Sequence, residues 1–294
     1  MLEIKNLSVQ LGDRELLHDV NLTVGTGARH LLRGANGSGK TTLAQTIGGA
    51  ISTNSVQTTP PLGIVCHSRE GGNDGAVLRV GGGTTDIVNK SMSPHRSANS
   101  QTDSPQGGSY KTEPLVTSGQ IIFDGHDITS ENATTRALMG IFLGAQNVPE
   151  IPGLTVMSFL RHSLVAHTRF ETGKDLSAGL FYQKLMAARE RLSIPEEWLS
   201  RSINLGFSGG ERKRLMFLRL LMTRPKVAIL DEPDSGADAS AQKLFADIIM
   251  EMNGQPTAHS PQPTAFLIIS HQQHFTDMIQ PTAITDLKDG RVVV

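Results

Sequence analysis

The chain has 294 residues, a length that fits one large domain or two domains of ordinary size. Its 27 Lys and Arg residues against 28 Asp and Glu residues leave a formal net charge of −1, which argues against a globally basic nucleic-acid-binding protein. The single cysteine, Cys66, excludes an intramolecular disulfide. No run approaches the roughly 18 apolar residues that span a bilayer, and the first residues lack the apolar core of a signal peptide. We therefore expect a cytoplasmic protein without direct membrane insertion.

The first motif follows a short apolar strand that ends at Arg33. Residues 34–41 fit the pattern GxxxxGK[ST], and residues 42–47 continue as a helix. Glycines let the backbone curl so that successive N–H groups point at one phosphate group, and the positive end of the helix adds to that field. Lys40 can reach the β- and γ-phosphates, and the Thr41 hydroxyl can hold Mg²⁺. The pattern predicts a phosphate-binding loop made of Gly34, Ala35, Asn36, Gly37, Ser38, Gly39, Lys40, Thr41 and Thr42.

Residues 51–117 differ in composition from the rest of the chain. Six of the twenty residues 91–110 are Ser, and only three are apolar. Such a stretch buries too little apolar surface to offset the entropy of ordering it. We expect a disordered insertion, which is either a tolerated surface loop or the mark of a decaying gene. Cys66 and His67 lie within it and are only a weak candidate for a metal site.

Two later apolar segments end in polar residues. Residues 227–230 precede Asp231 and Glu232, a pattern typical of a central parallel strand whose carboxyl end meets ligands. Asp231 would hold the Mg²⁺ shell, and Glu232 could polarise the attacking water, typically worth about 10²–10⁴ in rate. Residues 265–270 form a similar segment that ends at His271, a candidate γ-phosphate sensor. Together with the phosphate-binding loop, these residues predict hydrolysis of a nucleoside triphosphate.

The segment 205–211, Leu-Gly-Phe-Ser-Gly-Gly-Glu, resembles the signature sequence of ABC-type ATPases. The other motifs then follow the order of that family along the chain. The resemblance identifies the phosphate loop as Walker A, the strand before Glu232 as Walker B, and residues 235–238 as the D-loop. It adds Gln146 as a catalytic Q-loop residue and Mg²⁺ ligand. The ATP contacts that it implies beyond the phosphate loop are Ser208, Gly209, Gly210, Glu211 and Asp238.

The same resemblance implies an α/β fold, a P-loop NTPase of ABC type with a mixed sheet core, an antiparallel β part and an inserted α-helical subdomain. We expect residues 1–50, 118–146 and 206–294 to form the ATPase core and residues 147–205 the helical subdomain. In this family the signature of one protomer grips the γ-phosphate of ATP held by another. ATP and Mg²⁺ are thus the implied cofactors, and a transient ATP-dependent homodimer is the implied assembly.

A narrower resemblance concerns residues 140–153 and 202–211, together with Asp234, where transporter ATPases more often carry Thr. These segments are similar to SufC, the ATPases of the SUF iron–sulfur cluster assembly system. The resemblance implies partners similar to SufB and SufD, which are scaffold proteins rather than permeases. The alternative is the nucleotide-binding subunit of an ABC membrane transporter, which would engage its permease through the same region.

Two further features of the sequence concern hydrolysis and the choice of base. A non-hydrolysing module left by degeneration is a third hypothesis, against which the intact Lys40, Glu232 and His271 argue. Leu11 stands where many relatives have an aromatic residue that stacks on adenine, so the sequence does not support a choice between ATP and GTP.

Overall fold

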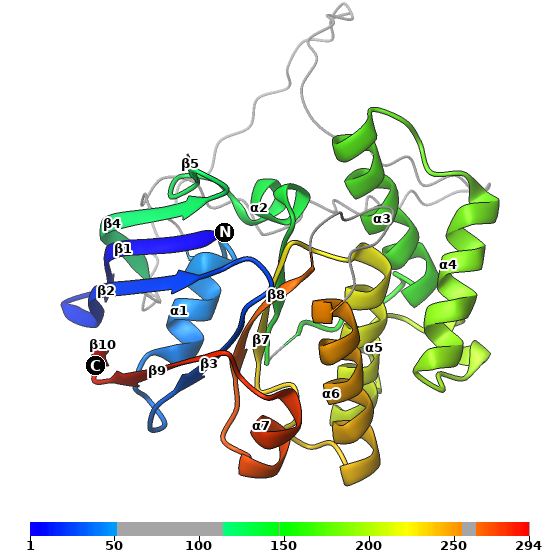
Figure 1. Cartoon of the computed structure of the whole chain (residues 1–294). Helices are drawn as coiled ribbons and strands as arrows, with labels where there is room; N and C mark the ends of the chain where they lie inside the picture. The colour runs from blue at the N-terminus through cyan, green and yellow to red at the C-terminus, as the bar shows by residue number, and fades with distance from the viewer. Residues whose placement is uncertain (52–113, 147, 255–262, 294) are drawn as a thin grey trace, which may run out of the picture. The chain divides into compact units, whose positions relative to one another are not determined.

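The computed structural model describes residues 1–51, 114–146, 148–254 and 263–293, which contain ten strands, seven α-helices and one 3₁₀ helix (Figure 1). The strands are β1 (Leu2–Leu11), β2 (Arg14–Val24), β3 (Arg29–Arg33), β4 (Leu115–Phe123), β5 (His126–Asp127), β6 (Ile141–Gly144), β7 (Val227–Asp231), β8 (Ala265–Ile269), β9 (Ala283–Lys288) and β10 (Arg291–Val293). The helices are α1 (Lys40–Ile47), α2 (Ala133–Met139), α3 (Val156–Thr172), α4 (Ala178–Arg191), the 3₁₀ helix η1 (Glu196–Ser200), α5 (Gly209–Thr223), α6 (Ala239–Gly254) and α7 (Gln273–Ile279).

The strands form two sheets. One is antiparallel, with the order β2-β1-β4-β5, and the other has the order β10-β9-β3-β8-β7-β6. In the second sheet all neighbours pair in parallel except β10, which pairs antiparallel with β9. This arrangement confirms the predicted mixed sheet with a separate antiparallel part. Parallel pairing brings the carboxyl ends of β3, β6, β7 and β8 to one edge, where the predicted motifs begin.

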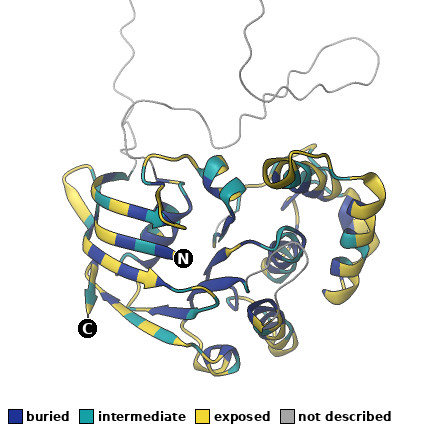
Figure 2. Cartoon of the chain, turned by 45° about the horizontal axis from the view of Figure 1, so that its top comes forward, coloured by how far each residue is buried: buried dark blue, intermediate teal, exposed yellow. Residues whose placement is uncertain are grey.

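Strand β7 is buried on both faces and divides two apolar cores. Val227 and Ile229 pack into the core that contains α1 and the antiparallel sheet, whereas Ala228 and Leu230 pack into the core that contains α5 and α6. Successive side chains of a strand point to opposite faces, so a continuous apolar run needs cover on both sides. Figure 2 shows the resulting dark blue strands between the two layers.

Helix α1, which follows the phosphate loop, is held at its C-terminal end by Arg136 of α2. The Arg136 guanidinium donates to the carbonyl oxygens of Thr46 at 2.6 Å and Ile47 at 2.9 Å. Burial lowers the pKa of Arg136 to about 10, so this side chain stays charged at neutral pH. The last carbonyls of a helix have no partner within the helix, and a cation there also complements the helix dipole. Arg136 therefore fixes the far end of the helix that carries Lys40.

The segment expected to be helical contains α3, α4 and η1. The side chains of Thr155 and Ser177 cap the two longer helices by accepting hydrogen bonds from the backbone N–H groups of Ser158 and Leu180. The apolar side of this pair packs into the same core as α5, through the residues Leu160, Leu164, Phe181 and Leu185. No helix in the described ranges is both long and apolar enough to cross a membrane.

Strand β4 extends into the C-terminal end of the segment predicted as the insertion. Strand β4 begins at Leu115 rather than after residue 117, and Val116 is buried and paired with Val9 of β1. Ile51 is also described, and it is buried in the core with α1. The apolar residues at both margins add to existing cores, which the average composition of the segment concealed. The remaining residues of the predicted insertion, with Cys66 and His67, lie outside the described residues.

Candidate nucleotide site

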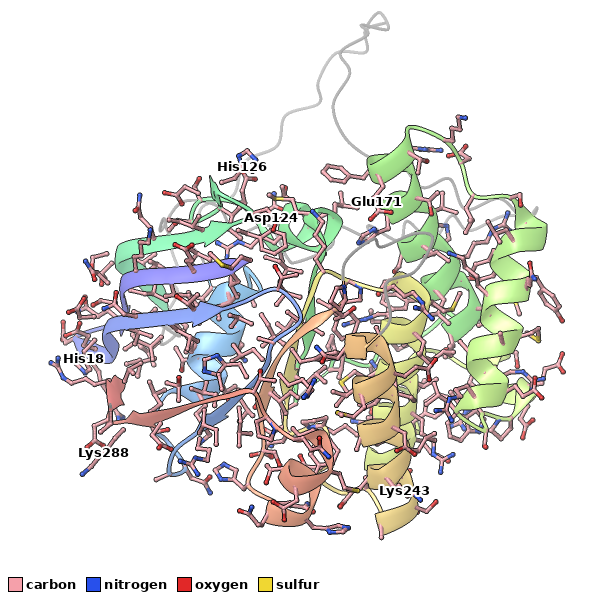
Figure 3. The ribbon with its side chains drawn as sticks, viewed as in Figure 1. His18, Asp124, His126, Glu171, Lys243 and Lys288 are labelled. Carbon is pink, nitrogen blue, oxygen red and sulfur yellow. The ribbon has the colours of Figure 1, made fainter. Side chains whose placement is uncertain are left out.

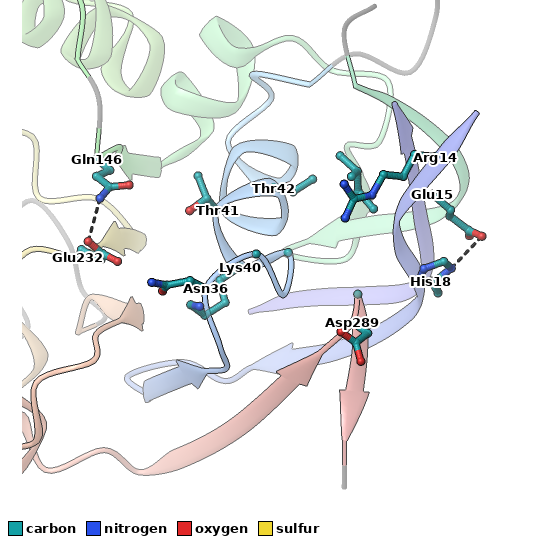
Figure 4. A pocket seen from close by; sticks show the side chains of 14 residues that line it. Arg14, Glu15, His18, Asn36, Lys40, Thr41, Thr42, Gln146, Glu232 and Asp289 are labelled. Atoms are coloured by element: carbon teal, nitrogen blue, oxygen red, sulfur yellow. Dashed lines mark hydrogen bonds and ion pairs between the residues drawn. The ribbon is translucent and has the colours of Figure 1, made fainter. Parts of the chain in front are cut away.

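A cavity of about 730 Å³ lies where β3, β6 and β7 end (Figure 4). The phosphate loop and the first turn of α1 form its floor. Gln146 and Glu232 lie at one end of the view, and the start of β2 with the β9–β10 turn lies at the other. The lining residues are Arg14, Glu15, Leu16, His18, Asn36, Gly37, Gly39, Lys40, Thr41, Thr42, Gln146, Glu232, Asp289 and Gly290.

The phosphate loop wraps around its own lysine. The Lys40 ammonium donates to the carbonyl oxygens of Gly34 at 2.7 Å and Ala35 at 2.9 Å. Burial lowers the pKa of Lys40, and the negative charges of Glu232 and Asp231 oppose that shift. Gly34 has a φ of 152°, and a Cβ there would lie 2.1 Å from the carbonyl oxygen of Leu287. The strand β9 thus presses on the loop so closely that only glycine fits.

Thr41 and Asp231 meet at the same edge of the sheet. The Asp231 carboxylate is 2% exposed, and burial raises the pKa of that carboxyl, a shift that the neighbouring Thr41 side chain opposes. Hydroxyl and carboxylate oxygens are ligands that Mg²⁺ prefers, so this pair fits the predicted metal position. In the described ranges no group of three or more His, Cys, Asp and Glu side chains could hold a metal. Mg²⁺ commonly keeps several waters and binds substrate phosphates beside one or two carboxylates, so a site of this kind does not require such a group.

The Glu232 carboxylate lies between two of the predicted catalytic residues. The Gln146 side-chain amide donates to Glu232 Oε2 at 2.8 Å, as Figure 4 shows, and His271 Nε2 lies 3.9 Å from Glu232 Oε1. Glu232 has a φ of 51°, a left-handed conformation that few side-chain-bearing residues adopt. The ends of β6, β7 and β8 thus bring Gln146, Glu232 and His271 together.

A lysine that the sequence did not single out supports this unusual conformation. Lys213 of α5 is buried and donates from Nζ to the backbone carbonyl of Glu232 at 2.6 Å. Burial lowers the pKa of Lys213, and the charges of Asp231, Asp234 and Glu232 oppose the shift. Its neighbours Arg212 and Arg214 are also cationic, so no pattern in the sequence distinguishes the one that points inward.

The signature residues and Asp238 do not line the cavity. The Ser208 side chain accepts a hydrogen bond from the Glu211 backbone, and the Glu211 carboxylate accepts one from the Ser208 backbone at 2.8 Å, which together cap α5. The Asp238 carboxylate accepts a hydrogen bond from the backbone of Ala241 at 2.8 Å, in the first turn of α6. Within one copy of the chain these groups serve helix ends, and their predicted contacts with ATP stay a prediction.

The cavity wall opposite Glu232 comes from residues that the sequence did not indicate. His18 Nδ1 lies 2.8 Å from Glu15 Oε2, and the backbone N–H of His18 donates to Gly290 at 2.9 Å. Gly290 in turn donates to the backbone carbonyl of Ser38 at 3.0 Å, which ties the wall to the phosphate loop. Figure 3 shows His18 at the end of the molecule away from α3 and α4. Leu11, at the usual aromatic position, is not among the lining residues.

Comparison with known protein families shows which family the chain belongs to. A sequence model of the family described as ABC transporter matches residues 17–59 and 109–235. The chain belongs to the ABC family of ATPases. Its P-loop architecture and its ability to bind and hydrolyse ATP follow from that membership. The residues between the two matched ranges coincide with most of the predicted insertion.

Several curated ABC proteins are similar over the whole chain. A probable ABC transporter ATP-binding protein of Streptococcus pyogenes is 32% identical, covering 100% of this chain and 88% of that protein. The probable ATP-dependent transporter ycf16 of Antithamnion sp. is 30% identical, and the alignment covers 100% of this chain and 90% of that protein. The iron–sulfur cluster assembly protein SufC of Plasmodium falciparum is 28% identical, and the alignment covers 100% of this chain and 65% of that protein.

Solved ABC cassettes share the fold. The dimeric ATP-binding cassette MJ0796, solved in a post-hydrolysis state with ADP and phosphate, superposes with a TM-score of 0.67 at 16% identity. The alignment covers 100% of this chain and 97% of that one. This likeness confirms the predicted ABC-type α/β fold.

The contact of Gly290 with the cavity wall gives a testable prediction. Gly290 has a φ of 75°, and a Cβ there would lie 2.5 Å from the Leu16 carbonyl oxygen and 2.8 Å from His18 Cδ2. Gly173 has a similar φ of 69°, but a Cβ there meets nothing within 4 Å. In urea unfolding, Gly173→Ala should lower the free energy of unfolding by about 1 kcal/mol, from backbone strain alone. Gly290→Ala should lower the free energy of unfolding by about 2–4 kcal/mol, because overpacking adds to the strain. Equal losses would mean that the wall is not closely packed.

Proposed function

We propose that this ABC ATPase is the ATP-hydrolysing subunit of a SUF-type iron–sulfur cluster assembly complex. In this proposal it dimerises on ATP and remodels a scaffold similar to SufB and SufD. The observation that carries the hydrolytic part is that Lys40 and the Gln146–Glu232 pair line the same cavity. A phosphate-binding lysine and a carboxylate that can activate water are what phosphoryl transfer to water needs.

The phosphate loop binds the β- and γ-phosphates through its backbone N–H groups and the positive end of α1. The Lys40 ammonium, which now donates to Gly34 and Ala35, turns to the phosphates when they enter. The exchange replaces two neutral acceptors by charged ones, which makes each hydrogen bond stronger.

Thr41, Asp231 and Gln146 would hold Mg²⁺, which would supply positive charge to offset the charge of the β- and γ-phosphates. Glu232 orients the attacking water and takes its proton, while His271 contacts the γ-phosphate. The hydrogen bond from Gln146 to Glu232 holds the carboxylate at the mouth of the cavity before the nucleotide arrives. Because Gln146 donates through its amide nitrogen, its side-chain oxygen stays free and could serve as a metal ligand while the bond to Glu232 is kept.

A second copy of the chain completes the site. Gly209 and Gly210 begin α5 directly after Ser208, and the positive N-terminal end of this helix is an anion site that lies outside the cavity of its own copy. The MJ0796 cassette was solved as a dimer, which supports the same assembly here. Asp238, which caps α6, lies at the same boundary between copies.

The similarity to the Plasmodium protein named SufC and the residue Asp234 support the SUF assignment over a transporter. Asp234 is 2% exposed and accepts a hydrogen bond from the Ser270 hydroxyl at 2.8 Å, next to His271. A transporter subunit is the second candidate, favoured by the similarity to the Streptococcus protein named an ABC transporter ATP-binding protein.

Replacement of the proposed base separates binding from hydrolysis. Glu232→Gln keeps the shape of the side chain but removes its basicity, so the hydrolysis rate should fall by about 10²–10⁴. The variant should still bind ATP and should accumulate as a dimer in size-exclusion chromatography with ATP. Lys40→Ala should lose both binding and dimer, and the exposed Glu197→Gln should match the wild type. A Glu232→Gln variant that stays monomeric with ATP would contradict the assembly.

Affinity capture of the full chain from its native cells separates the two candidate functions. The SUF proposal predicts that two scaffold proteins copurify and that an ATP-trapped Glu232→Gln variant changes their yield. Recovery of membrane permeases without such scaffold proteins would support the transporter subunit and would overturn the SUF assignment.

A further inference from the structure

The two ends of the nucleotide cavity differ in chemistry. Glu232 and Gln146 lie on one side of Lys40, and Arg14, Glu15, His18 and Asp289 lie on the other (Figure 4). If the γ-phosphate faces Glu232, as the proposed function requires, the ribose and base must extend toward Arg14. The lining of this end includes no Phe, Tyr or Trp: Leu11 is not in the lining, Leu16 is aliphatic, and the one aromatic ring is that of His18.

We propose that the guanidinium of Arg14 is the stacking platform for the nucleotide base. The observation is a planar cation at the nucleoside end of a cavity that has no Phe, Tyr or Trp in its lining. Arg14 begins β2, and Figure 4 shows its side chain directed toward the part of the cavity where Thr42 lies. In the described part of the chain no group accepts a hydrogen bond from its guanidinium and no acid pairs with it.

An exposed, unpaired guanidinium can stack on the face of a base because it is planar and weakly hydrated. Its charge adds an attraction to the π-face of the ring. The other planar side chain of this wall, His18, is already engaged: Glu15 holds its Nδ1 at 2.8 Å, and its ring packs against Gly290. Glu15 and Gly290 thus hold the His18 ring in place, whereas the Arg14 guanidinium, without a partner in the described residues, can turn to meet the base.

Stacking reads the face of a base and not its hydrogen-bonding edge. The Arg14 platform consequently accepts adenine and guanine alike, so that this wall binds purine nucleotides without strong preference between ATP and GTP. Selectivity, where it is needed, has to come from other groups or from the nucleotide pool.

The test compares nucleotides with the bare phosphates. Calorimetric titration of the full chain with ADP, GDP and inorganic pyrophosphate, each with Mg²⁺, avoids turnover during the measurement. Arg14→Ala should raise the dissociation constants for ADP and GDP by about 5- to 30-fold, the usual size of one base–side-chain stack. Pyrophosphate has no base, so its dissociation constant should stay within about twofold of the wild-type value.

Two variants separate stacking from simple charge. Arg14→Lys keeps the positive charge but lacks the planar guanidinium, so it should weaken ADP binding nearly as much as Arg14→Ala does. Arg14→Tyr restores a flat surface and should recover ADP binding. Arg291→Ala, an exposed arginine of nearby β10 that does not line the cavity, is the matched control and should bind all three ligands as the wild type does.

The proposal is overturned if Arg14→Ala binds ADP as tightly as the wild type does. It is also overturned if the affinity for pyrophosphate falls as much as the affinity for ADP, which would make Arg14 a phosphate contact. Loss of ADP binding in His18→Ala but not in Arg14→Ala would also overturn it. Since this inference rests on the proposed function, the wild-type titration comes first. A wild-type chain that binds pyrophosphate but no purine nucleotide would refute the proposed function itself.

Discussion

The parallel pairing of β3, β6, β7 and β8 is the constraint on which the candidate site depends. Each strand is short, and each ends at the same edge of the sheet. The residues that follow them are the phosphate loop, Gln146, Glu232 and His271, which are far apart in the sequence. None of these side chains could act alone, and the ladder of backbone hydrogen bonds sets their relative positions. The two apolar cores that cover β7 make this ladder rigid.

The site is further held by groups that press on its backbone. Lys213 binds the carbonyl of Glu232, which has a left-handed conformation, and the Leu287 carbonyl packs against Gly34. Arg136 fixes the C-terminal end of α1. Strained conformations persist where the surrounding contacts over-determine them, and they concentrate at functional sites. The buried Lys213 ammonium stabilises the charged forms of Asp231 and Asp234 and is stabilised by them, since each charge would be unfavourable alone.

The sequence predicted those parts of the site that are local in the chain. The phosphate loop, the acidic end of β7 and the signature each occupy one short segment, so their patterns are readable directly. The wall made by Arg14, His18 and Gly290 joins the beginning of the chain to its end, and no short pattern marks that contact. The inward direction of Lys213 depends on which face of α5 meets β7, which only packing determines. The first residues of β4, Leu115 to Thr117, were grouped with the predicted insertion because they directly follow a long polar stretch.

One copy of the chain contains two incomplete halves of the proposed site: a phosphate loop inside the cavity and a signature outside it. The most direct test mixes Lys40→Ala, which lacks the first half, with Gly209→Asp, which blocks the second. A Cβ at Gly209 meets nothing within 4 Å, so the aspartate should fold normally and repel a phosphate brought by another copy. Each variant alone should be inactive in ATP hydrolysis, and the mixture should recover part of the wild-type rate because mixed dimers contain one intact site. A mixture no more active than its separate components would contradict a site shared between two copies.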